Sequence, residues 1–246
     1  MVEVESAPRG PYYGEPRRHP TRFLEELMRK NVGTAALAML VCFMASTSHA
    51  AQAPNPEVLN LALKAISCGV ASGDLQAPPT LTLIDYSLPS TTPRLWVFDL
   101  HTGKILFNEL VAHGRGTGNN IASRFSDAMD SQASSLGLFH AADAYIGHNG
   151  YSLRLDGLEP GFNGHARDRA IVIHGAAYVD AGVAKANGRL GRSWGCPALR
   201  EAVARQVIDT VRDGGMIFSY YPDPAWLKAS KFLNCAPHAR ATIATN

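Results

Sequence analysis

The chain has 246 residues, of which 46% are hydrophobic and 18% charged, and its formal net charge is +2. These proportions are typical of a globular protein with a sizeable core, and the length allows one large domain or two small ones. The near-neutral charge argues against a nucleic-acid-binding function.

The first fifty residues predict an export signal and not a folded domain. An apolar run over residues 32–44 follows a positive pair, and Ser48-His49-Ala50 forms a signal-peptidase site. The run is shorter than the about 20 residues of a membrane span. We therefore expect residues 1–50 to hold an N-terminal extension and a signal peptide, with Met28 as the functional start and cleavage near Ala50. The protein would then work in the periplasm or another extracytoplasmic space, and would meet the membrane only during export.

The exported chain is expected to begin with a short helix. Asn55-Pro56-Glu57 supplies a cap residue, a proline for the first turn and an acid at the positive helix end. Apolar residues at helical spacing follow as far as Gly69, and Pro78-Pro79 then breaks the chain. Residues 51–79 are thus predicted to form a helix and a linker.

Beyond the two prolines the pattern becomes strand-like. Alternating or continuous apolar runs rich in β-branched and aromatic residues predict strands at 81–86, 94–100, 105–111, 151–155, 170–174 and 216–221. Residues 113–137 are predicted to form a long loop, and residues 199–212 a helix with an acidic start and a basic end. Because helices and strands do not alternate, we expect a β-rich mixed α+β domain over residues 80–222, with one main helix and a C-terminal tail over 223–246.

The chemistry is expected at Cys196, in the run Gly-Arg-Ser-Trp-Gly-Cys-Pro. Pro197 is a typical first helical residue, so the thiol is predicted to lie at a helix N-terminus, where unpaired N–H groups favour the thiolate and offer an oxyanion hole. Gly195 leaves space beside the sulfur. His174 ends an apolar strand 22 positions earlier, which allows the chain to return and place the imidazole beside the sulfur as a base.

These residues carry a resemblance to a known family. His174-Gly175 followed by Ser193-Trp194-Gly195-Cys196 resembles the signature of the murein L,D-transpeptidase catalytic domain, often called YkuD-like, over roughly residues 81–221. The resemblance implies a β-sandwich or barrel domain. Trp194 stands where the family motif has His, and Pro197-Ala198 replaces the residues that lead to an Arg, so the chain looks like a divergent branch.

The resemblance implies acyl transfer on peptidoglycan stem peptides with no cofactor. Cys196 would attack the diaminopimelate carbonyl of a tetrapeptide stem and release D-Ala, with His174 as the base, oriented by the Gly175 carbonyl or by Ser193. A side-chain amine of another stem would then form a 3→3 crosslink. Water as acceptor would make the enzyme an L,D-carboxypeptidase, and a lipoprotein lysine would make it an anchoring enzyme. Reactivity toward carbapenems is also implied.

Other residues are predicted to line the substrate cleft. They are Gly195, Trp194, Arg192, His113 and Tyr178, and either Arg192 or Arg200 is a candidate to replace the missing motif Arg. Trp194 either shields the thioester from water or packs under the helix. No metal site is expected, because none of the loop histidines has zincin-like spacing; these histidines are His113, His140, His148 and His165.

Two other interpretations stay open, one a different enzyme and one a binding module. A sortase-like cysteine acyl transferase also uses the order His, Cys, Arg on a β-rich fold, although the Ser-Trp-Gly-Cys run and the helix after it do not suit one. A catalytically inactive wall-binding module would use Trp194 to stack on glycan. The exported chain keeps three cysteines, so at least one stays unpaired, and Cys68 and Cys235 form either a disulfide or two buried thiols.

Overall fold

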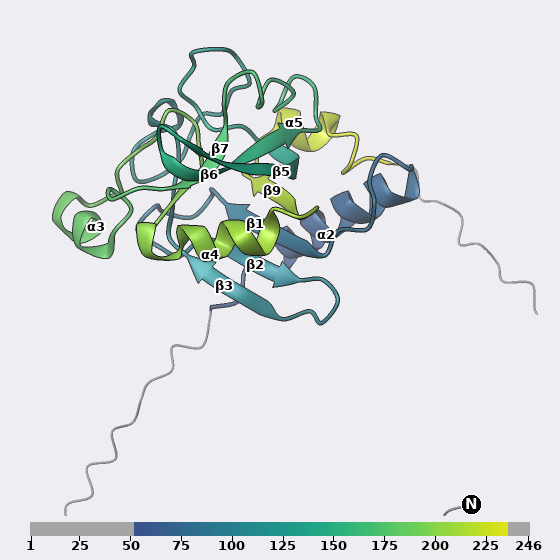
Figure 1. Ribbon diagram of the computed structural model, residues 1–246. Helices are drawn as coiled ribbons and strands as arrows, with labels where there is room; N and C mark the ends of the chain where they lie inside the picture. Colours follow the sequence, from purple (N-terminus) through teal and green to yellow (C-terminus); the bar gives the residue numbers. More distant parts are fainter. Residues whose placement is uncertain (1–51, 236–246) are drawn as a thin grey trace, which may run out of the picture. The chain divides into compact units, whose positions relative to one another are not determined.

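The computed structural model describes residues 52–235 (Figure 1), and the predicted extension and signal peptide over residues 1–50 lie outside them. In the described range no helix has both the length and the apolar character needed to span a bilayer.

A nine-stranded sheet organises the described part of the chain, in the order β3-β2-β1-β9-β5-β6-β7-β8-β4. Two of the eight pairings are parallel, β1 with β9 and β7 with β8, and the others are antiparallel. The strands are β1 (Thr80–Asp85), β2 (Leu95–Asp99), β3 (Ile105–Glu109), β4 (Val111–Ala112), β5 (Gly137–Gly147), β6 (Gly150–Gly157), β7 (Val172–Gly175), β8 (Ala198–Leu199) and β9 (Met216–Tyr220).

The sheet curls into a nearly closed barrel. Its two edge strands, β3 and β4, are consecutive in the chain and are separated only by Leu110, so the two edges must approach each other. The guanidinium of Arg200 bonds both carboxylate oxygens of Glu109 at 2.8–2.9 Å, which ties the end of β3 to the segment after β8. The predicted β-rich mixed α+β class, with a barrel-like domain, is confirmed.

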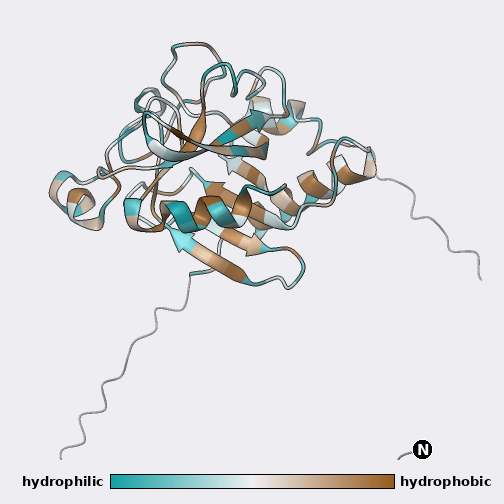
Figure 2. Cartoon of the chain, viewed as in Figure 1, coloured by the Kyte–Doolittle hydropathy of each residue, from teal (hydrophilic) through white to brown (hydrophobic). Residues whose placement is uncertain are grey.

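Helices cover both faces of this sheet. They are α2 (Pro56–Ala71), α3 (Ala181–Asn187), α4 (Glu201–Val211) and α5 (Pro224–Ala229), with a 3₁₀ turn η1 at Arg115–Thr117. Successive strand residues point to opposite faces. Accordingly, Ile84 of β1 joins an apolar cluster with α4, whereas Leu81 and Leu83 join a second cluster with α2 and α5. In Figure 2, β2 and the first part of β3 are coloured as hydrophobic, and α4 carries both hydrophilic and hydrophobic residues.

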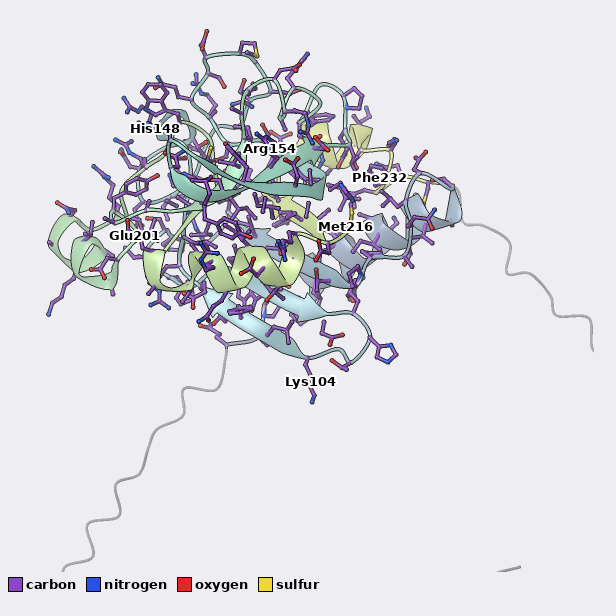
Figure 3. The ribbon with its side chains drawn as sticks, viewed as in Figure 1. Lys104, His148, Arg154, Glu201, Met216 and Phe232 are labelled. Carbon is purple, nitrogen blue, oxygen red and sulfur yellow. A yellow bond between two sulfur atoms is a disulfide. The ribbon has the colours of Figure 1, made fainter. Side chains whose placement is uncertain are left out.

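The predicted domain boundaries at 79/80 and 222/223 do not separate structural units. Val58 and Ala62 of α2 and Trp226 of α5 are buried in one cluster. Phe232 and Met216, which Figure 3 labels, belong to the same cluster. An apolar helix face must be covered, and here the sheet covers both terminal helices. The expected linker helix and C-terminal tail are therefore parts of the domain core.

A disulfide joins these two terminal segments. Cys68 at the end of α2 is paired with Cys235, with a Cα–Cα distance of 6.1 Å and a sequence separation of 167 residues. The alternative of two buried thiols is thus excluded. Within the described residues Cys196 is the free cysteine.

Two further differences concern secondary structure. Strand β5 was not expected, because a register shift between Ala141 and Ala144 breaks the alternation that would have revealed it. Helix α4 begins at Glu201 and not at Pro197 or Leu199, because Ala198–Leu199 pairs with β7 and β4 as strand β8. Cys196 therefore does not lie at a helix N-terminus, and that prediction is wrong.

Candidate active site

The parallel pairing of β7 with β8 brings the predicted nucleophile and base together. His174 of β7 is the register partner of Ala198, which follows Cys196 by two residues. Both side chains line one cleft of about 490 Å³.

The imidazole of His174 is held in one tautomer. Its Nδ1 lies 2.9 Å from the carbonyl oxygen of Gly175. A carbonyl only accepts, so Nδ1 carries the proton and Nε2 keeps a free lone pair. Burial lowers the pKa of His174, which favours the neutral ring. The arrangement suits a general base.

Ser193 does not orient this ring. Its Oγ donates to the carbonyl oxygen of Cys196 at 2.6 Å and accepts the N–H of Gly195 at 3.1 Å. Ser193 therefore shapes the turn that carries the nucleophile. The Gly195 N–H is already bonded, so the predicted oxyanion role does not fall to it.

The thiol of Cys196 is buried and is surrounded by groups that act in opposite directions on its ionisation. Its Sγ lies 3.6 Å from the carbonyl oxygen of Ala170. Burial raises the pKa of Cys196, while the Val172 N–H, the charge of Arg169 and the Cys196 N–H lower it. Burial thus favours the neutral thiol of Cys196 as it favours the neutral imidazole of His174, and both side chains line the same cleft.

Arg169 supplies the positive charge that was expected from a helix terminus. Its side chain is only 3% exposed, and its guanidinium donates to the carbonyl oxygens of Ser126 (2.8 Å) and Ala133 (2.6 Å). It also donates to the hydroxyls of Ser135 (2.6 Å) and Ser131 (3.1 Å). Arg169 thus fixes residues 126–135 beside the nucleophile. Nothing in the local sequence distinguishes it from the exposed arginines.

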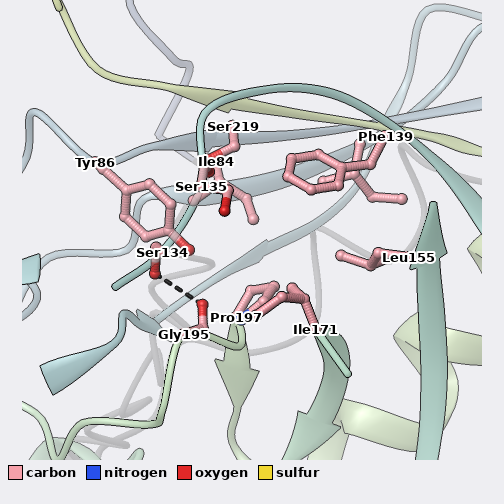
Figure 4. A pocket seen from close by; sticks show the side chains of 11 residues that line it. Ile84, Tyr86, Ser134, Ser135, Phe139, Leu155, Ile171, Gly195, Pro197 and Ser219 are labelled. Atoms are coloured by element: carbon pink, nitrogen blue, oxygen red, sulfur yellow. Dashed lines mark hydrogen bonds between the residues drawn. The ribbon is translucent and has the colours of Figure 1, made fainter. Parts of the chain in front are cut away.

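The turn before Cys196 fits tightly against this loop. Ser134 Oγ donates to the Gly195 carbonyl oxygen at 2.9 Å (Figure 4) and accepts the N–H of Gly114 at 3.0 Å. Gly195 has a φ of +128°, and a Cβ there would lie 2.9 Å from the carbonyl oxygen of Ala133. Only glycine suits this position. The cavity in Figure 4 has about 10 Å³, too little for a substrate.

Several predicted residues do line the cleft. Tyr178, Arg192 and Trp194 are joined there by Arg115 and by His148 of the β5–β6 turn (Figure 3), neither of which was predicted to do so. Trp194 is 68% exposed, so it does not pack under the helix. The Arg115 guanidinium carbon lies 5.4 Å from its ring centroid. Burial and the nearby Cys196 raise the pKa of Tyr178 to about 12.

Two predicted residues lie elsewhere. His113 is 1% exposed and does not line the cleft, because its Nδ1 accepts a bond of 2.7 Å from the buried Arg94. Desolvation and the charge of Arg94 lower the pKa of His113 to about 4. Arg200 is bonded to Glu109 and is unavailable to a substrate. In the range 52–235 no three potential ligands gather into a metal site.

Comparison with known families agrees with this geometry. A family model described as the L,D-transpeptidase catalytic domain matches residues 50–220. The chain belongs to this family. The match favours the resemblance seen in the sequence over the sortase-like alternative. No curated protein matches the chain significantly.

Several solved structures are similar to the chain at low identity. The L,D-transpeptidase from Mycobacterium smegmatis is 15% identical over 58% of this chain and 59% of its own, with a TM-score of 0.37. The enzyme from Stackebrandtia nassauensis is 15% identical, with coverages of 67% and 68% and a TM-score of 0.38. The helical cell shape determining protein Pgp2 from Campylobacter jejuni is 13% identical, with coverages of 59% and 48% and a TM-score of 0.41. The chain thus spans less than two thirds of the Mycobacterium smegmatis relative.

Proposed function

We propose that this protein is a peptidoglycan L,D-transpeptidase that forms 3→3 crosslinks through a thioester on Cys196. One observation carries the proposal: a free thiol and an imidazole with a fixed tautomer line the same cleft. Membership of the L,D-transpeptidase catalytic domain family supports acyl transfer as the reaction class. Both groups are neutral at rest, so the thiol proton must leave as the sulfur attacks.

In the acylation step, Nε2 of His174 takes the proton of Cys196 while Sγ attacks the diaminopimelate carbonyl of a tetrapeptide stem. The Cys196 N–H, which lowers the pKa of its own sulfur, is our candidate donor to the developing oxyanion. The protonated imidazole then gives its proton to the departing amine. The C–N bond breaks, D-Ala leaves, and the acyl group stays on sulfur.

In the second step, an acceptor amine attacks the thioester. Nε2 of His174 removes a proton from the amine, the new C–N bond forms, and the C–S bond breaks. The proton then returns to Sγ, which restores the neutral pair. Water in place of the amine would give carboxypeptidase activity. In this proposal the indole of Trp194, which is exposed and lines the cleft, shields the thioester from water.

We also propose that the protein works outside the cytoplasm. The Cys68–Cys235 disulfide supports this location, because structural disulfides persist in oxidising compartments. It agrees with the signal peptide expected from the sequence. Expression with the native leader followed by fractionation tests the proposal, and protein retained in the cytoplasm with reduced thiols would contradict it.

Reactivity toward strained cyclic acyl donors is part of the proposal. The related structures include LD transpeptidase LdtMt1 in complex with imipenem and the Ldtfm–avibactam carbamoyl enzyme. A strained acyl donor of this kind would meet the same thiol in this cleft. We therefore expect carbapenems to acylate Cys196 and to block crosslinking.

The test is a crosslinking assay with purified disaccharide-tetrapeptide. The wild-type protein should form a dimer with loss of D-Ala, and fragmentation by mass spectrometry identifies the carbonyl and the amine that were joined. Cys196→Ala should form none, while Cys68→Ala/Cys235→Ala, which removes the disulfide and leaves Cys196 in place, should stay active. Dimer formation by Cys196→Ala would overturn the proposal. An inactive protein whose Cys196 resists iodoacetamide would favour the wall-binding module.

A further inference from the structure

The cleft around Cys196 has an unbalanced charge. Arg115, Arg169 and Arg192 line it, and no Asp or Glu is among its lining residues in the described chain, although Arg169 has Asp127 at 4.0 Å behind the cleft wall. The N–H groups of Arg169 are engaged with the 126–135 loop. Arg115 and Arg192 are different: within residues 52–235 neither has a carboxylate within 4.0 Å. Two uncompensated guanidiniums therefore face the substrate space.

Both arginines come from segments that are tied to the turn carrying the nucleophile. The backbone N–H of Arg115 donates to the Ser193 carbonyl at 2.8 Å, and its exposed guanidinium lies over the Trp194 ring, 5.4 Å from the centroid. Arg192 Nη1 donates to the Gly118 carbonyl at 2.9 Å and to Asn119 Oδ1 at 3.1 Å. Because the two hydrogen bonds hold the Arg192 side chain in advance, a ligand loses less free energy in binding it.

We propose that Arg115 and Arg192 form a carboxylate-binding subsite that holds the acyl donor beside Cys196. The proposal rests on the proposed function, since it names what the cleft recognises in its substrate. The planar guanidinium matches a carboxylate better than any other side chain does. In a tetrapeptide stem, the carboxylate nearest the scissile amide is that of the terminal D-Ala. Arg115 and Arg192 would thus bind the residue that leaves.

The ligand chemistry can be tested without any transpeptidase activity. Iodoacetate and iodoacetamide both alkylate sulfur: an S–C bond forms, the C–I bond breaks, iodide leaves, and the thiol proton passes to His174. They differ in charge, so the ratio of their rates at Cys196 reports the anion subsite, while the iodoacetamide rate alone reports the reactivity of the thiol.

We expect Arg115→Gln and Arg192→Gln each to lower the iodoacetate-to-iodoacetamide ratio about three- to fivefold at low salt, and the double variant to lower it further. High salt should reduce the wild-type ratio toward that of the double variant. Arg212→Gln, which removes the same charge outside the cleft, should leave the ratio unchanged. A ratio that is the same in the wild type and the double variant overturns the subsite.

A second measurement uses stems that end in D-Ala or in D-alanine amide. The wild-type KM should rise at least tenfold for the amide, with a smaller change in kcat, and the double variant should no longer distinguish the two donors. Equal KM values in the wild type would overturn the assignment to the terminal carboxylate. If crosslinking is absent but the alkylation ratio still falls in the variants, the proposed function fails while the anion subsite stands.

Discussion

Replacing Arg169 by glutamine should both destabilise the fold and slow the nucleophile. The substitution removes a buried cation that makes four hydrogen bonds, two of them to the carbonyls of Ser126 and Ala133. Glutamine can restore one at most, and each buried acceptor left unpaired costs about 1–3 kcal/mol. We therefore expect a loss of about 3–5 kcal/mol in the free energy of unfolding.

The same change should alter the chemistry of Cys196. The charge of Arg169 lowers the pKa of this thiol, so its removal raises the pKa further and shifts the alkylation profile to higher pH. Arg169→Lys keeps the charge but cannot bridge four acceptors. It should therefore lower the free energy of unfolding, while shifting the pH profile of alkylation less than Arg169→Gln does. Urea unfolding and iodoacetamide rates against pH measure the two effects. An Arg169→Gln variant within about 1 kcal/mol of the wild type, with a superimposable profile, would refute the reasoning.

Three more outcomes follow from the buried groups. The pKa of His113 falls from 6.5 to about 4 on folding, so its contribution to the free energy of unfolding is complete above pH 6.5 and should drop by up to about 3 kcal/mol as the pH falls to 4. Urea unfolding measured against pH should therefore show a weaker pH dependence for His113→Gln than for the wild type. An equal pH dependence in the two proteins would contradict this. Cys68→Ser should cost about 2–4 kcal/mol, and dithiothreitol should weaken the wild type but not the variant. Gly195→Ala, whose Cβ would lie 2.9 Å from the Ala133 carbonyl oxygen, should slow alkylation of Cys196 at least tenfold with an unchanged circular dichroism spectrum. Gly103→Ala, at a φ of +71° but in open space, is the control. A Gly195→Ala variant as reactive as this control would count against the tight fit.

The sequence was informative wherever the signal was local. Strands such as β1 and β9 follow from short apolar runs, and the candidate pair of Cys196 and His174 follows from residue types at the ends of elements. Strand β5 was not predicted, because its bulge disrupts the alternation of apolar and polar residues. The start of α4 was misplaced because Ala198–Leu199 gains two strand partners that no local pattern reveals.

The charged groups of the site are positioned and buried by contacts between residues that are far apart in the sequence. Arg169 is buried by residues 34 to 43 positions away, and Arg94 meets His113 across 19 positions. In the sequence, a buried arginine of this kind looks the same as Arg192, which faces the cleft. His113 was therefore expected in the cleft, while Arg169, which acts on the nucleophile, was not singled out. The sequence shows which residues are arginine or histidine, but which of them are buried depends on how the sheet curls into the nearly closed barrel.

The most direct test is the mass of the acylated protein. Incubation with a tetrapeptide donor or with imipenem, followed by intact-mass measurement and peptide mapping, should show one acyl group on the peptide that contains Cys196. The adduct should be absent in Cys196→Ala and should form much more slowly in His174→Gln. An adduct on another residue, or the same adduct in Cys196→Ala, would contradict the assignment of Cys196 as the nucleophile.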